Sequence, residues 1–209
     1  MTERGMIFNG EMVRAILDGR KTQTRRIVKG TDGAVKFCKE WDINGEEIFV
    51  VLGEKDHTGM NPVLGAISCP FGGVGDRIWV RETWARYNID QNSHDLAYRA
   101  TTPADWPEEG RWRPSIHMPR WASRILLEIT DVRVERLNAI SEEDARAEGI
   151  IDGGCLNCGE PEPCGCANPE PDATDAFAYL WQSIYGQENW NANPWVWVIE
   201  FKRVEGGAA

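Results

Sequence analysis

The spacing of apolar residues divides the chain into many short strands and few helices. Apolar residues at helical spacing predict helices over residues 11–18, 141–149 and 174–185. Alternating or continuous apolar runs predict strands over residues 24–28, 77–84, 96–99, 123–137 and 195–201. Because short strands outnumber helices, we expect an α+β fold, a small mixed β-barrel with short helices at its mouth. We expect one domain spanning residues 1–209.

Two stretches interrupt this pattern and are predicted to be insertions, at about residues 30–66 and 151–172. In the first, Asn44-Gly45 separates apolar runs over residues 34–41 and 47–52, which predicts a β-hairpin. The second is rich in glycine, proline and acidic residues, which predicts a surface loop.

The second insertion also holds four of the six cysteines, with the spacing Cys155-x2-Cys158-x5-Cys164-x-Cys166. The first pair has the spacing of a zinc knuckle, and thiolates are preferred ligands in structural zinc sites. The alternative is an acidic loop with reduced thiols. We expect any zinc here to be structural, and we expect no cofactor for catalysis. Cys38 and Cys69 are predicted to be isolated thiols.

Net charge limits the class of partner. At −10, the chain is not expected to be a general binder of phosphate backbones, although residues 1–30 carry seven basic against three acidic residues. Any contact with a polyanion should therefore be local. No apolar run approaches the length of a membrane span and no signal peptide is evident, so we expect a cytoplasmic protein with no membrane partner.

The most distinctive stretch is the octet Gly19-Arg-Lys-Thr-Gln-Thr-Arg-Arg26. Asn9 is a plausible N-cap for the preceding helix, and Gly19 stands where a glycine would end it. A lysine and a threonine three residues apart at a helix-to-strand junction, Lys21 and Thr24, can converge on one small site. Taken alone, however, the octet is also typical of a solvated basic turn.

Several motifs together resemble the ASCH family. Gly19-x-Lys21-x-x-Thr24-x-Arg26 is similar to the family signature, and Gly75-Asp76 before residues 78–80 to its turn into a barrel strand. Residues 140–149 and 198–202 resemble its short helix and its closing strand. Residues 115–124 look like a subgroup of phage-encoded ASCH proteins. The resemblance implies a PUA-like β-barrel with a cleft, lined by the octet, that binds or acts on RNA and nucleobases.

One member type of the family removes the acetyl group from N4-acetylcytidine with a Lys, a Thr and a Glu. By motif these fall on Lys21, Thr24 and Glu148. Thr24 would be the nucleophile or hold a water, Lys21 would be its base or stabilise the oxyanion, and Glu148 would orient Lys21 or transfer a proton. To act as a base near neutrality, Lys21 would need its pKa of about 10.4 lowered by about three units, roughly 4 kcal/mol. Otherwise Glu148 is a solvated residue in the last turn of a helix.

Other polar and aromatic side chains are candidates for binding the substrate, because Arg and Trp together suit phosphate contact and base stacking. They are Arg20, Arg26, Arg81, Glu82, His117, Arg120 and Trp121. For His117, flanked by Ile116 and Met118, the alternative is a hydrogen-bonded packing residue.

Three functions follow in order of preference. The first is hydrolysis of an N4-acylated cytosine nucleoside, and the second is non-catalytic binding of RNA or a modified base. A ribonuclease is third, because the sequence lacks a histidine pair suited to acid–base cleavage. The expected partner is a nucleoside or a short single-stranded nucleic acid.

Overall fold

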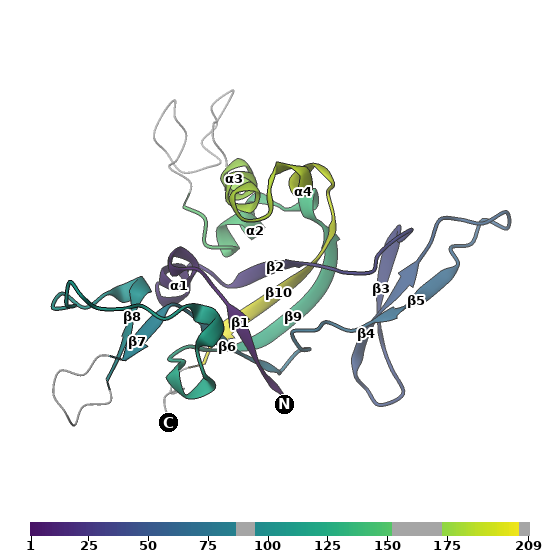
Figure 1. The fold of residues 1–209 in the computed structure, drawn as a ribbon. Coiled ribbons are helices and arrows are strands. Elements are labelled where there is room, and N and C mark those ends of the chain that lie inside the picture. The colour runs from purple at the N-terminus through teal and green to yellow at the C-terminus, as the bar shows by residue number, and fades with distance from the viewer. Residues whose placement is uncertain (87–94, 152–172, 205–209) are drawn as a thin grey trace.

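The computed structural model describes residues 1–86, 95–151 and 173–204. In these ranges the chain forms ten strands and four α-helices, which confirms the α+β class (Figure 1). The four cysteines of the predicted zinc loop lie outside the described residues. None of the described helices has the length and apolar character of a bilayer-spanning segment.

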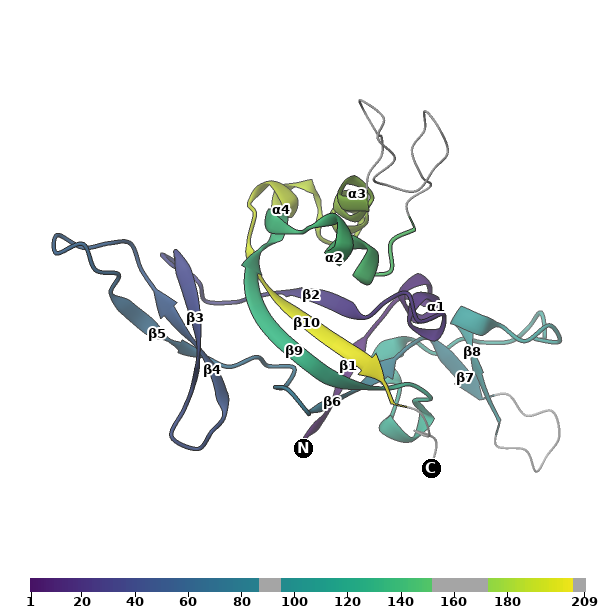
Figure 2. The ribbon, with the colours of Figure 1, turned by 180° about the vertical axis from the view of Figure 1, so that it is seen from behind.

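A five-stranded sheet forms the body. Its order is β1 (Glu3–Ile7), β6 (Arg77–Arg81), β9 (Leu126–Arg136), β10 (Trp195–Arg203) and β2 (Gln23–Ile27). Only β1 and β6 run parallel, and the other neighbours in this sheet are antiparallel. The long strands β9 and β10 curve strongly around the body (Figures 1 and 2).

The sheet does not close into the expected barrel. Among the described strands, β1 and β2 remain its two edges, with no backbone ladder between them. The side chain of Arg26 lies between these edges, where Nη2 donates to the carbonyl of Ile7 at 3.1 Å. A side chain therefore occupies the place where closure would require direct strand pairing.

Both faces of β10 are buried, which explains its continuous apolar run. Trp197, Ile199 and Phe201 belong to the main core beneath the curved sheet. Val196 and Val198 point the other way, into a second core beneath the helices. That second core joins β10 to α2 (Glu142–Ala147) and α3 (Ala173–Tyr185).

The helices begin and end at the residues that local chemistry favours. In α1 (Gly10–Leu17), the side chain of Asn9 accepts from the Met12 N–H, and Gly19 beyond its end has φ +76°. Ser141 caps α2, accepting from the Asp144 N–H at 3.1 Å. The three predicted helices are thus confirmed. The short α4 (Gln187–Asn191) was not predicted, because its five residues hold a single strongly apolar side chain, Trp190.

The first insertion forms a separate three-stranded antiparallel sheet, which projects from the body in Figures 1 and 2. The predicted hairpin is β3 (Lys36–Trp41) and β4 (Glu47–Leu52), to which β5 (Val63–Ile67) adds an unpredicted third strand. We call this sheet the arm. A further two-stranded antiparallel sheet pairs β7 (Trp84–Arg86) with β8 (Leu96–Tyr98).

Candidate functional site

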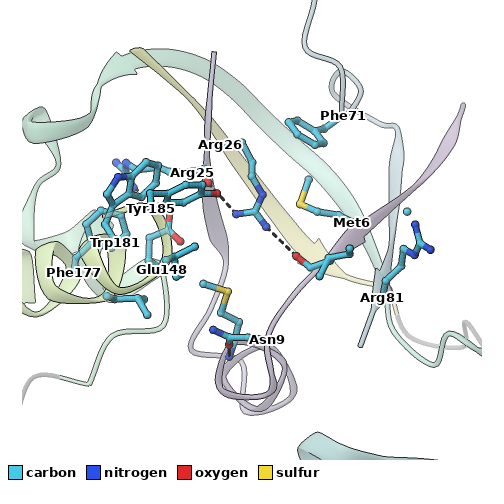
Figure 3. A pocket seen from close by; sticks show the side chains of 15 residues that line it. Met6, Asn9, Arg25, Arg26, Phe71, Arg81, Glu148, Phe177, Trp181 and Tyr185 are labelled. Carbon is cyan, nitrogen blue, oxygen red and sulfur yellow. Dashed lines mark hydrogen bonds and ion pairs between the residues drawn. The ribbon is translucent and has the colours of Figure 1, made fainter. Parts of the chain in front are cut away.

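A pocket of about 480 Å³ lies between the two sheet edges and α3 (Figure 3). Most of its lining is apolar. The lining residues are Gly5, Met6, Ile7, Asn9, Met12, Arg25, Arg26, Phe71, Arg81, Glu148, Phe177, Leu180, Trp181, Ile184 and Tyr185. Its size and apolar character, with a few convergent polar groups, are those of a small-molecule site.

One wall of the pocket is the face of α3. Phe177, Trp181 and Tyr185 recur every four residues, so they stack along one side of the helix. The rings of Trp181 and Tyr185 lie 4.4 Å apart, tilted by 34°. The predicted apolar face of this helix therefore serves two purposes: part of it packs the core, and part of it remains open to the pocket.

Two arginines of β2 bring polar groups to the pocket. Neighbouring residues on a strand point to opposite faces, yet both Arg25 and Arg26 of β2 reach the pocket because it opens beside that edge strand. Arg26 Nη1 donates to the carbonyl of Arg25 at 2.9 Å, and Nη2 to that of Ile7, as Figure 3 shows. Its guanidinium is thereby held across the gap between β1 and β2.

Glu148 reaches the pocket from the C-cap of α2, where Gly149 (φ +90°) ends the helix. Behind it, Lys21 Nζ donates to Glu148 Oε2 at 2.5 Å and to the Glu148 carbonyl at 2.9 Å. The two side chains are 0% and 3% exposed. A buried ion pair between the octet and α2 therefore forms part of the pocket wall.

Arg25 ties this pair into a larger network. Its guanidinium lies 3.4 Å from Glu148 Oε1 and 3.0 Å from Asp144 Oδ2. It also donates to the side-chain oxygen of Gln23. Its Nε is buried and has no hydrogen-bond partner among the described residues. The side chain of Arg25 is thus fixed from several sides while one donor remains unused.

Burial lowers the pKa of Lys21. The charge of Glu148 acts in the opposite direction and favours the ammonium form, whereas the nearby Arg25 and Arg26 disfavour it. Because desolvation is the largest of these effects, the ammonium of Lys21 is easier to deprotonate than that of an exposed lysine.

Thr24 does not join Lys21 and Glu148 directly. Its side chain is fully buried, and its Oγ1 accepts from Arg26 Nη1 at 2.9 Å. No hydrogen bond between described residues links Thr24 to Lys21 or Glu148. Of the three predicted catalytic residues, Lys21 and Glu148 are in contact, and only Glu148 lines the pocket.

The predicted substrate-binding residues separate into two groups. Arg26 and Arg81 line the pocket. Arg20 instead lines a neighbouring cavity of about 470 Å³ and donates to the carbonyl of Gly149 at 2.8 Å. Glu82 is buried away from the pocket, in a bidentate pair with Arg124 at 2.9 and 3.0 Å.

The loop that holds His117, Arg120 and Trp121 does not line the pocket either. His117 is exposed, and Arg120 pairs with Glu3 at 2.8 Å. Trp121, 60% exposed, packs edge-on against Trp84. Arg81, which lines the pocket, contacts this loop through its guanidinium, which donates to the carbonyl of Ile116.

Sequence reasoning missed most of the pocket. The β1 residues Gly5, Met6 and Ile7 gave no signal, because β1 is short and pairs with a strand more than 70 residues away. Arg25 was recognised only as one of the residues of the basic octet, and its place in the pocket lining was not predicted. The apolar residues of α3 were predicted only as one face of a helix, and no local pattern distinguishes core packing from pocket lining.

Among the described residues, no group of three or more His, Cys, Asp or Glu side chains could hold a metal ion. No family model, curated protein or solved structure matches this chain.

Proposed function

We propose that the pocket binds a pyrimidine nucleoside and that the chain hydrolyses the amide of an N4-acylated cytosine. The observation that carries this proposal is the buried Lys21–Glu148 pair in the wall of an aromatic pocket. Planar bases stack on aromatic side chains, and Tyr185, which is 38% exposed and lines the pocket, offers such a ring with Trp181 packed against it. The guanidinium of Arg26 suits the carbonyl and sugar oxygens of such a ligand.

Glu148 is the proton carrier in this proposal, because it is the only carboxylate among the described residues that line the pocket. It takes a proton from a water whose oxygen attacks the acyl carbon. The proton then passes to N4 as the C–N bond breaks, which releases the cytosine and a carboxylic acid. Lys21 acts from behind, holding Glu148 through its 2.5 Å contact.

Arg26 stabilises the oxyanion that forms at the acyl oxygen. Thr24 is a positioning residue here, since its hydroxyl accepts a hydrogen bond from Arg26 and its side chain does not reach the pocket. In this proposal Lys21, Thr24 and Glu148 each have a role that fits the burial of their side chains.

The finer fold assignment belongs to the same proposal. We infer that the open five-stranded sheet is a PUA-like barrel of ASCH type in which Arg26 bridges the edges β1 and β2. The bridge is supported by the hydrogen bond from Arg26 to Ile7 and by the curvature of β9 and β10 (Figure 2).

The test is turnover of N4-acetylcytidine, followed by its ultraviolet shift. Glu148→Gln should lower kcat by about 100-fold or more, the usual effect of losing a general base. Thr24→Val should lower it by about tenfold through Arg26. The matched controls are Glu143→Gln, an exposed acid of the same helix, and Thr22→Val, an exposed threonine of the same turn. Absence of turnover, or full turnover by Glu148→Gln, would refute the hydrolase.

A second candidate, binding without chemistry, is favoured by one observation: Lys21 and Thr24 are fully buried and contribute nothing to the pocket lining. Binding is measured by quenching of tryptophan fluorescence with cytidine and with short single-stranded oligonucleotides. Trp181→Phe should remove most of the signal. A steep fall of affinity with salt would identify phosphate contacts and hence a nucleic-acid ligand. Quenching by nucleosides without turnover would establish this second function.

A further inference from the structure

The arm has two faces of different character. Its inner face packs on the body: the Phe37 ring lies 4.9 Å from that of Trp195, and the Phe49 ring 5.0 Å from that of Trp197. Lys39 adds an ion pair to Asp131 of β9 at 3.0 Å. Because side chains alternate along a strand, the residues between these point to the opposite, outer face.

The outer face is also apolar. Cys38, Val50 and Ala66 lie directly opposite one another on β3, β4 and β5, so they form a row across the sheet. Ile48 and Leu52 flank Val50 along β4. All five side chains are partly or fully exposed, and none packs against the core of the body. No described helix or strand covers this side in Figures 1 and 2.

Two side chains of opposite charge lie at equal distances on either side of the row Cys38–Val50–Ala66. Lys36 and Glu40 lie two residues before and after Cys38 on β3, and therefore on the same outer face. Both are exposed, and no described residue forms an ion pair with either of them. Four residues apart on a strand, they are separated by roughly 13 Å and cannot pair with each other.

We infer that the outer face of the arm is the contact surface of a twofold-symmetric homodimer. The twofold axis runs along the row Cys38–Val50–Ala66, between two arms stacked face to face at about 10 Å. Rotation about this axis reverses the direction of each strand and places it over the same strand of the second copy. Leu52 then meets Ile48 of the second copy, and Lys36 meets Glu40 of the second copy.

A second copy is favoured over an unrelated partner because the surface is complementary to itself. The register pairs Lys36 with Leu52 and Glu40 with Ile48, so one rotation matches apolar to apolar and cation to anion together. An isologous interface requires this self-complementarity, whereas binding to a different protein does not. Pairing would also remove the apolar row from water.

Sedimentation velocity across a concentration series tests the inference. The wild-type chain should approach twice the mass of one chain as its concentration rises. Lys36→Glu places two glutamates opposite each other at both ends of the interface and should raise the dimer Kd about tenfold. Adding Glu40→Lys restores opposite charges and should return the Kd to within about threefold of wild type. Lys29→Glu, an exposed lysine outside the arm, is the control.

Rescue by the double reversal would support the proposed axis, because loss of folding cannot produce it. A wild-type chain that stays monomeric throughout the series, or a dimer unaffected by Lys36→Glu, would overturn the inference.

Cys38 provides an independent measure of the same geometry. Since it lies on the proposed axis, a short thiol-to-thiol crosslinker should join two wild-type chains, and Cys38→Ser should abolish that product. Val50→Asp, which sets two carboxylates face to face on the axis, should abolish it as well. Circular dichroism shows whether this variant keeps its fold. Crosslinking that persists in Cys38→Ser would contradict the proposed axis.

Discussion

Lys21 and Arg25 are two cationic side chains of one basic octet, and both lie out of contact with water. At the residue scale, the spacing of the octet predicted that Lys21 could take part in a small site. Its burial could not be predicted, because the residues that enclose it come from α1 and α2. The acidic partners Asp144 and Glu148 lie about 120 residues along the chain.

The lowered pKa of Lys21 predicts how stability depends on pH. The unfolded chain holds the lysine proton more tightly, so the unfolding free energy of the wild type, relative to Lys21→Met, should rise with pH. The rise begins near the folded-state pKa and ends near the ordinary value of about 10.4. Its slope is at most about 1.4 kcal/mol per pH unit, the value for one proton.

Urea denaturation between about pH 7 and pH 10 measures this difference. As a control, the wild type relative to Lys29→Met, a substitution at an exposed position, should show no such rise of the unfolding free energy with pH. A difference that falls with pH would mean that Glu148 outweighs burial and that Lys21 stays charged.

At the scale of elements, local rules were sufficient where an element depends on its own caps. Asn9 begins α1 and Gly19 ends it, as the sequence predicts, and Ser141 and Gly149 do the same for α2. The strands β1 and β5 were missed because their pairing, rather than their pattern, defines them. Gly149 shows how a cap also determines the site: its Cα approaches α1 and the octet closely, which brings Glu148 to Lys21.

Gly149→Ala should therefore lower the unfolding free energy by more than the positive φ of Gly149 alone implies. A Cβ at this position would lie 2.8 Å from the Cβ of Ala15 and 3.0 Å from that of Lys21. Gly19 is the matched control, since it has φ +76° and open space around its Cα. Gly19→Ala should lower the unfolding free energy by about 1 kcal/mol and Gly149→Ala by about 3 kcal/mol. Equal decreases of the unfolding free energy for the two variants in chemical denaturation would show that α2 can move away from Ala15 and Lys21 to accommodate the added methyl group.

At the scale of the whole molecule, the arm is attached to the body by aromatic contacts and one ion pair, although the sequence marks it as an insertion. The predicted hairpin turn at Asn44-Gly45 is correct, but it says nothing of where the hairpin packs. That placement depends on Trp195 and Trp197, about 150 residues further along the chain.

If the arm and the body unfold together, weakening their contact must destabilise the whole chain. Phe49→Ala removes a buried ring from this contact and should lower the unfolding free energy by about 3–5 kcal/mol in one transition. Trp41→Ala, at a position 65% exposed, should change it by less than about 0.5 kcal/mol. Two separate transitions in Phe49→Ala, followed by tryptophan fluorescence and circular dichroism, would show that the arm unfolds independently.

The sequence by itself determined the features that depend on neighbouring residues: the α+β class, the helix limits, the hairpin turn and the octet as a junction. These follow from capping, turn chemistry and apolar spacing, which act within a few residues. Only the tertiary structure decided that the sheet stays open, that Glu148 rather than Thr24 reaches the pocket, and that α3 supplies an aromatic wall. Those outcomes depend on which distant surfaces exclude water from one another, and burial of that kind leaves no local pattern.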